Sequence, residues 1–387
     1  MTDAHVKWAD ALRRWLAEDD REAEAELRAF TGLDAGDLER AVAQVRDLLS
    51  DDAATREVIR RAHAMLGSDP ERALWIAHLA TILAPRVWLG EARMDAMIEL
   101  DGDALREYAA ALLEVGSFAR AAEAATLARR DYNVLAGPPV KGLSILDLIE
   151  GRILHELGRT KEGLGMVQRG SNMLLVFHDD KESYVKGRTI EAALLFKGER
   201  YQEAMSVYAA MSEHAREEED TELLAYVLQM VGRCRVKFGQ FDEGRECIET
   251  AIRMFEDLKL FAEVPRVRKG LVEIAVARGR YNEAVSELYK MHNAFLALHL
   301  PIVAALVELD VVDLLMVSGR TGDIPTLCKK MLATFTEAGL RRNALMALAH
   351  IHALAQDGAL ESDDVQKVRA YLERLSGDPD AAFTASM

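Results

Sequence analysis

Two short segments contain residue types that could catalyse a reaction or bind a nucleotide. His178 precedes Asp179 and Asp180, a combination that could exchange protons. We expect these side chains in a solvated turn that caps helix ends, and we expect no catalysis there. The segment GLGMVQRG at 163–170 is rich in glycine, but it lies in a predicted helix that follows no strand. Because the sequence also lacks the phosphate-cradling GxxxxGK[ST] pattern, it predicts no nucleotide site.

Metal-ligand and thiol chemistry is equally unsupported by residue spacing. His350 and His352 are two residues apart, so on a helix they point to different sides and cannot converge on one ion. Cys234, Cys247 and Cys328 are too few and too widely spaced for a disulfide framework, which favours a reducing cytoplasm. We expect all three to be buried structural thiols. The sequence therefore predicts a protein that is not an enzyme and that has no catalytic residue, no cofactor and no bound metal.

Length and charge restrict the remaining classes of function. A chain of 387 residues exceeds one ordinary core and implies two or three domains or one elongated repeat array. Its abundant Ala, Leu, Glu and Arg favour helices. The net charge of −16 repels nucleic acid and anionic lipid on average. There is no apolar run of about eighteen residues and no apolar signal core, so we expect a cytoplasmic protein with no nucleic-acid or membrane partner.

The elements that must position any functional residue recur every forty residues or so. A Phe, Tyr or Thr column is followed three residues later by a small or apolar residue, and a glycine stands two or three residues before it. The column steps by 42, 41, 40, 40 and 40 residues through Phe118, Thr160, Tyr201, Phe241, Tyr281 and Thr321. Apolar residues on both sides recur at three- and four-residue spacing, which is typical of amphipathic helices. Each unit is therefore predicted to be a helical hairpin that reverses at a glycine tolerant of positive φ.

The repeat divides the chain into an array with flanking caps. Residues 1–54 are predicted to form an acidic helical N-terminal cap or docking module, and residues 341–375 a degenerate capping repeat. The tail at 376–387 is predicted to be disordered. The repeat solenoid occupies residues 55–340, with turns near 69, 117, 159, 199, 240, 280 and 320.

The turn motifs GRYNEA, GQFDEG and GERYQEA resemble the tetratricopeptide repeat, whose turn reads Gly-x-aromatic-x-Glu-Ala. The usual period of that family is about 34 residues. The longer period here is similar to that of long-repeat bacterial regulators of the superfamily, and the Trp typical of the first helix is missing from the repeats. The resemblance implies an all-α fold: a right-handed α-solenoid of about seven antiparallel helical hairpins with helical N-terminal and C-terminal caps.

The resemblance also implies where a ligand binds, because the first helices of such hairpins line a concave wall. In this chain the implied ligand-facing residues are largely basic, which is unexpected at a net charge of −16. They are Arg152, His155, Lys186, Phe196, Lys197, Tyr226, Gln229, Arg233, Lys237, Arg266 and Lys269. A basic wall attracts an acidic partner, and Arg can donate two hydrogen bonds to one carboxylate. Alternatively, these cations solvate the inner face and pair with neighbours such as Glu222 or Glu273.

Toward the C-terminus the same wall turns apolar at Leu306, Leu309 and Met316, which predicts a mixed ligand, acidic at one end and apolar at the other. The Asn residues of the family's two-carboxylate clamp are missing from the matching positions, so a chaperone-tail clamp is not expected. The sequence predicts a protein- or peptide-binding scaffold that acts as a regulatory or adaptor subunit. The alternative is a peptide-sensing regulator that changes pitch on ligand binding and controls an effector or transcription factor.

Overall fold

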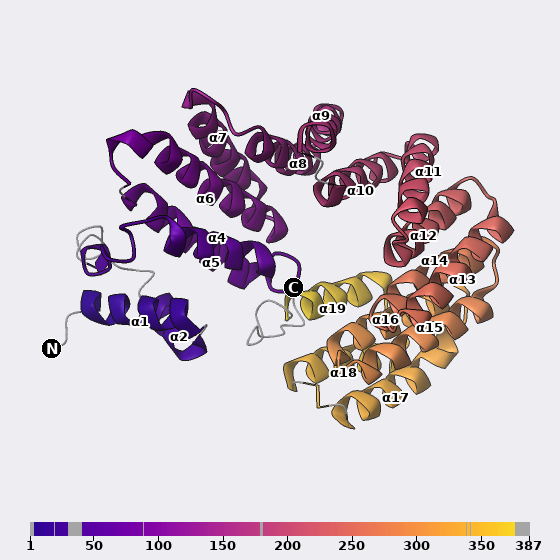
Figure 1. Cartoon of the computed structure of the whole chain (residues 1–387). Helices are drawn as coiled ribbons and strands as arrows, with labels where there is room; N and C mark the ends of the chain where they lie inside the picture. Colours follow the sequence, from indigo (N-terminus) through magenta and orange to yellow (C-terminus); the bar gives the residue numbers. More distant parts are fainter. Residues whose placement is uncertain are drawn as a thin grey trace. The chain divides into compact units, whose positions relative to one another are not determined.

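The computed structural model describes residues 4–18, 20–29, 41–87, 89–178, 181–337, 339–340 and 342–375. Within these ranges every regular element is a helix, which confirms the all-α prediction (Figure 1). The predicted tail at 376–387 lies outside the described residues, as do Asp179, Asp180 and the side chain of His178. The chain divides into two compact units, Met1–Arg200 and Tyr201–Met387.

Unit 1 contains an N-terminal helix pair followed by helical hairpins. Its elements are α1 (Ala4–Glu18), α2 (Arg21–Ala29), α4 (Ala53–Met65), α5 (Pro70–Leu83), η1 (Ala84–Arg86), η2 (Glu91–Arg93), α6 (Met94–Glu114), α7 (Phe118–Val134), α8 (Val140–Glu156), α9 (Thr160–His178) and α10 (Lys181–Lys197). Trp15 of α1 is fully buried and meets Trp75 of α5 edge to face at 5.7 Å. Arg61 of α4 donates hydrogen bonds to the carbonyl oxygens of Trp15 and Leu16, which satisfies orphan acceptors at the end of α1.

Unit 2 continues the same pattern to the C-terminus. Its elements are α11 (Tyr201–Glu217), α12 (Thr221–Lys237), α13 (Phe241–Asp257), α14 (Glu263–Ala277), α15 (Tyr281–Ala297), α16 (Pro301–Val317), η3 (Thr321–Asp323), α17 (Ile324–Glu337), α18 (Arg342–Gln356) and α19 (Ser362–Arg374). Local sequence sets several of these starts. The Asp220 side chain accepts a hydrogen bond from the backbone N–H of Leu223 at 2.9 Å, and Pro301 occupies the first turn of α16, where a missing N–H costs least.

Helices pack in chain order within each unit. First helices pack against the second helix of the same hairpin, as in α6 with α7, α8 with α9 and α12 with α13. First helices also contact the first helix of the next hairpin, as in α4 with α6, α6 with α8, α8 with α10 and α12 with α14. Side chains on first helices are therefore brought into continuous layers, which is the arrangement that a shared binding surface needs.

Residues with positive φ stand at two sets of turns, one within the hairpins and one between them. The turns inside hairpins use Gly116, Gly158, Glu199, Gly239, Gly279 and Gly319. The turns between hairpins use a second set forty residues apart, Glu219, Lys259, His299 and Gly339. A left-handed residue at a helix C-terminus lets the chain reverse while its N–H groups bond back to the last carbonyls, as Gly239 N–H does to Val236 O at 3.0 Å.

Candidate functional site

The described residues of unit 1 enclose a cleft of about 800 Å³ between four first helices. We call it the basic cleft. Its lining is Arg56, Ile59, Arg60 and His63 of α4, Asp103, Arg106 and Glu107 of α6, Lys141, Ile145 and Leu148 of α8, and Lys181, Glu182, Ser183 and Lys186 of α10. The spacings of three and four residues within α4, α6 and α8 place each set on one face of its helix.

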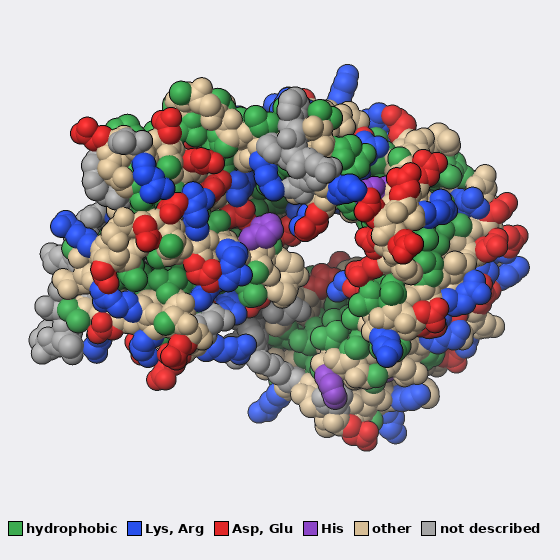
Figure 2. Space-filling model, viewed as in Figure 1, with side chains coloured by type: hydrophobic (Ala, Val, Ile, Leu, Met, Phe, Trp, Pro, Cys, Tyr) green, Lys and Arg blue, Asp and Glu red, His purple; other side chains and the backbone are tan. Residues whose placement is uncertain are grey.

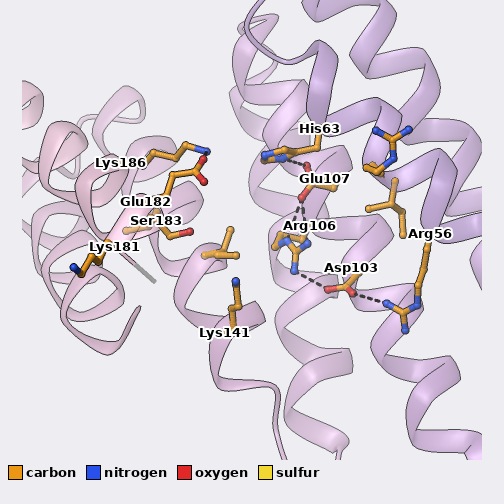
Figure 3. A pocket seen from close by; sticks show the side chains of 14 residues that line it. Arg56, His63, Asp103, Arg106, Glu107, Lys141, Lys181, Glu182, Ser183 and Lys186 are labelled. Carbon is orange, nitrogen blue, oxygen red and sulfur yellow. Dashed lines mark hydrogen bonds and ion pairs between the residues drawn. The ribbon is translucent and has the colours of Figure 1, made fainter. Parts of the chain in front are cut away.

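One wall of the basic cleft is a hydrogen-bonded network centred on Arg106. Arg106 Nη1 donates to Asp103 Oδ1 at 2.6 Å and to Tyr132 Oη at 2.8 Å, while Nη2 donates to Glu107 Oε1 at 3.2 Å. Tyr132 Oη in turn donates to Asp103 Oδ1 at 2.6 Å. Arg106 and Glu107 are largely buried, so these bonds fix the guanidinium in place (Figure 3).

His63 extends this network toward solvent. Its Nδ1 lies 3.0 Å from Glu107 Oε2, and the imidazole is more than half exposed while Glu107 is buried. The hydrogen bond to Glu107 raises the pKa of His63 against the opposing effect of burial. Burial alone would raise the pKa of Glu107, but its hydrogen bond to His63 and the charge of Arg106 outweigh burial and lower it. The hydrogen bond between the two side chains therefore shifts the pair toward imidazolium and carboxylate.

The opposite wall comes from α10, with α8 between. Figure 3 shows Lys186, Glu182 and Ser183 on α10 across from His63 and Glu107, and Lys141 of α8 between the two walls. Lys186 is more than half exposed and pairs with Glu182 at 2.7 Å. Ile59, Ile145 and Leu148 add apolar surface to the same cleft, so its lining is basic with apolar patches.

The charge balance in this cleft differs from that of the chain. On the face of each unit that Figure 2 shows, Lys and Arg side chains interleave with Asp and Glu. The cleft is lined by six Lys or Arg residues and three Asp or Glu residues, in a protein whose net charge is −16. A concave surface with an excess of one sign concentrates its field, so the basic cleft favours anionic groups.

The sequence-predicted residues of unit 1 lie on α8 and α10, but only Lys186 lines the cleft. Arg152 donates to Glu114 Oε1 at 2.6 Å, and Lys197 pairs with Glu156 at 3.0 Å. His155 Nδ1 lies 3.0 Å from Thr160 Oγ1, and partial burial lowers the pKa of its imidazole. Phe196 is half-buried near the end of α10.

The sequence-predicted residues of unit 2 lie on α12 and α14. Tyr226 and Gln229 are half-buried, and Lys237 and Lys269 are exposed. Arg233 lies 3.8 Å from Glu273, and Arg266 pairs with Glu263 at 3.3 Å. Arg233 therefore pairs with Glu273, as the alternative interpretation of these cations expects. A ligand role for these residues stays a prediction.

Sequence reasoning missed most of the basic cleft. Arg56, Arg60 and His63 recur at four and three residues and therefore share one face of α4, a signal that was present in the sequence. The turn between α4 and α5 contains Gly67, but α5 begins at Pro70 and lacks the Phe, Tyr or Thr that starts the second helix of the later units, so no ligand-facing residue was predicted on α4. Lys141 and Lys181 stand at the start of α8 and α10 and were not among the ligand-facing residues that the resemblance implied.

The three cysteines named from the sequence lie on α12, α13 and α17 of unit 2. Cys234 and Cys328 are buried, and burial raises the pKa of Cys234 to about 11 and that of Cys328 to about 12. Cys247 is half-buried rather than buried as predicted, because it lies at the edge of the α13 apolar face. Among the described residues, no group of three or more His, Cys, Asp or Glu side chains is placed to hold a metal ion. Over the same residues, no helix is both long and apolar enough to cross a membrane.

No protein-family model and no curated protein matches the sequence. The fold, however, matches solved structures. Aspartyl phosphate phosphatase F of Bacillus subtilis superposes on 98% of this chain and 94% of its own length, with a TM-score of 0.52 at 12% identity. A signal-transduction ATPase with a tetratricopeptide-repeat sensor, from Pyrococcus horikoshii, superposes on 98% of this chain with a TM-score of 0.51 at 12% identity.

The chain has a tetratricopeptide-type solenoid fold. This likeness confirms the class of fold predicted from the turn motifs. The match covers 63% of the Pyrococcus protein, so this chain spans less than two thirds of it. The basic cleft lies on the layer of first helices formed by α4, α6, α8 and α10.

Proposed function

We propose that this chain is a protein- or peptide-binding scaffold, a regulatory or adaptor subunit that captures an acidic segment of its partner in the basic cleft. The single observation that carries the proposal is the excess of cations in a cleft of about 800 Å³ on the first-helix layer. Its apolar residues Ile59, Ile145 and Leu148 fit a segment in which acidic and apolar side chains alternate. We place this activity in the cytoplasm, a location supported by three free cysteines.

The ion pairs already present do not block such a ligand. Arg60 is bonded to both oxygens of Glu57 and Lys186 to Glu182, but Arg60 and Lys186 remain more than half exposed. Exposed pairs of this kind contribute little to stability, so a ligand carboxylate can compete for either cation at little cost. Arg106 is different, because it is buried and paired with Asp103 and Glu107. It adds to the positive electrostatic potential of the cleft but offers no free hydrogen-bond donor to a ligand.

We infer a binding role rather than a catalytic one. One matched structure is named a phosphatase, and that name belongs to the Bacillus protein. In the basic cleft, the hydrogen bond between His63 and Glu107 raises the pKa of His63 and so increases the share of its charged form, which attracts anions. With six Lys or Arg residues in its lining, the cleft is suited to holding an anionic segment.

Charge reversal at Arg60 and Lys186 tests the proposal. The Arg60→Glu, Lys186→Glu chain should bind a fluorescein-labelled peptide of alternating Glu and Leu at least about tenfold more weakly than wild type, because two attractive contacts become repulsive. Fluorescence polarisation measures the affinity, and circular dichroism checks that the helices are intact.

The matched control changes net charge equally outside the cleft. Arg130 and Arg159 are exposed cations of the same unit that do not line it. The Arg130→Glu, Arg159→Glu chain should keep wild-type affinity within about twofold. Equal weakening in both chains would mean that total charge, not the basic cleft, attracts the peptide, and the proposal would fall.

A second candidate is a peptide-sensing regulator. It is favoured by the fold match to a protein with a tetratricopeptide sensor and by the division of this chain into two compact units at residues 200 and 201. Fluorophores on exposed positions of each unit would report a change in energy transfer when the Glu–Leu peptide binds. A scaffold would bind the peptide with unchanged transfer, whereas a sensor would change it.

A further inference from the structure

The C-terminal helix α19 does not pack only on its neighbour in the chain. It contacts α18, and it also contacts α16, the first helix of the preceding hairpin. Figure 1 shows α19 beside α16. In a regular array a second helix would continue the outer layer, but α19 instead reaches back to a first helix. The residues of α16 that it meets therefore belong to the layer on which a tetratricopeptide fold binds its ligands.

The forty-residue register identifies this face of α16. Leu309 corresponds to Lys269 and Gln229, and Asp313 corresponds to Glu273 and Arg233. Lys269 is exposed, but Leu309 is fully buried. Leu309, which the sequence predicts at the apolar end of the binding wall, is therefore already buried. It lies one helical turn from Asp313, which accepts a hydrogen bond from Arg369 of α19.

The contact of α19 combines an apolar stripe with one cation. Val365, Val368, Tyr371 and Leu372 are at most 1% exposed, and their three- and four-residue spacing forms one face of the helix. Arg369 Nη2 lies 2.8 Å from Asp310 Oδ1 and 2.9 Å from Asp313 Oδ2. This is the pattern by which an amphipathic helix docks in a groove: apolar anchors fill it, and a charge fixes the register.

α19 is also built to hold its helical form. A reciprocal capping box joins Glu361 and Asp364 at its start, and Lys367 pairs with Asp363 one turn later on its exposed side. It is the last described helix and follows α18 after residues 357–361, so it can leave α16 without opening another hairpin.

We propose that the face of α16 carrying Leu309, Asp310 and Asp313 is a second binding site, for an amphipathic helix of a partner protein with a basic residue beside its apolar stripe. In the resting chain α19 occupies this site, and the partner helix displaces it. This proposal concerns unit 2 alone and is independent of the basic cleft.

Charge reversal at Arg369, the cation through which α19 pairs with α16, tests the proposal. In the Arg369→Glu chain, hydrogen–deuterium exchange in α19 should accelerate about tenfold, while α14 and α15 stay unchanged, because attraction to two carboxylates becomes repulsion. A labelled synthetic peptide of residues 360–375 should bind this chain at least about tenfold more tightly than wild type, in which the tethered helix competes at high effective concentration. The same peptide with Glu at position 369 should bind neither.

The control and the rescue variant keep the test decisive. Lys367 lies on the exposed side of α19, so Lys367→Glu should change exchange by about twofold or less. If the Arg369→Glu chain loses its helical dichroism, the Asp310→Asn, Asp313→Asn chain removes the same attraction from the other side, and α19 should again exchange faster. Exchange in α19 that remains as slow as in α18, with no peptide binding, would show a permanent cap and overturn the proposal.

Discussion

At the scale of single residues, Glu308 places a carboxyl group inside the most apolar helix of unit 2. It is 3% exposed, and its Oε1 lies 3.5 Å from Nδ1 of buried His292, while Oε2 is buried without a hydrogen-bond partner among the described residues. Burial raises the pKa of Glu308 from its ordinary 4.5 to about 7. The sequence shows Glu308 between apolar neighbours but cannot show that α15 and α17 close over it, since this burial depends on packing between hairpins.

The raised pKa of Glu308 makes unit 2 sensitive to pH. Between about pH 4.5 and 7 the native state binds more protons than the unfolded state, so this group lowers stability as pH rises through that window. We expect Glu308→Gln, which keeps the shape and an acceptor for His292, to raise the free energy of unfolding by about 1–2 kcal/mol at pH 8. The gain should shrink toward pH 5. Urea unfolding at both pH values measures it, and a loss of stability at pH 8 would contradict the sign.

At the scale of elements, the hairpin of α8 and α9 depends on two glycines that bring the backbones together. A Cβ at Gly151 would lie 2.7 Å from the carbonyl oxygen of Gly163. Gly151→Ala should therefore lower the free energy of unfolding by about 1–3 kcal/mol, because neither backbone can yield without losing contacts. Gly165, also in α9, has no atom near its Cβ position, so Gly165→Ala should be neutral or stabilising by up to about 1 kcal/mol. Equal urea midpoints would contradict the close-approach argument.

The helical hairpins could be predicted from sequence because their turns carry a visible chemical mark. Glycines at positions such as Gly239 and Gly279 adopt positive φ, as the repeat indicated. At the turn after α10 it is Glu199 that adopts positive φ, although glycine stands one place earlier at Gly198. The turns between hairpins at Lys259 and His299 were not predicted, because neither residue type signals a left-handed conformation.

At the scale of the whole molecule, the candidate site was only partly predictable. The family pattern located the first helices and named Lys186, but it missed Arg60 and His63 on α4. Helical spacing shows which residues share a face, whereas the distance across a cleft depends on how successive hairpins stack. For the same reason the sequence named Leu309 as ligand-facing, although it is buried on the helix face that α19 contacts.

The total charge of −16 opposes the acidic ligand that the basic cleft attracts, and salt separates the two effects. Repulsion from the whole chain acts over long distances and is screened beyond about 10 Å at 0.1 M ionic strength, whereas contacts inside the cleft are shorter and partly sheltered. Affinity for the Glu–Leu peptide should therefore rise from about 10 mM salt to a maximum near about 100 mM and fall at higher salt. In the Arg60→Glu, Lys186→Glu chain, polarisation titrations should show affinity that rises with salt and does not fall again at higher salt. Affinity that falls steadily from the lowest salt would show that the cleft cations outweigh the total charge at every distance.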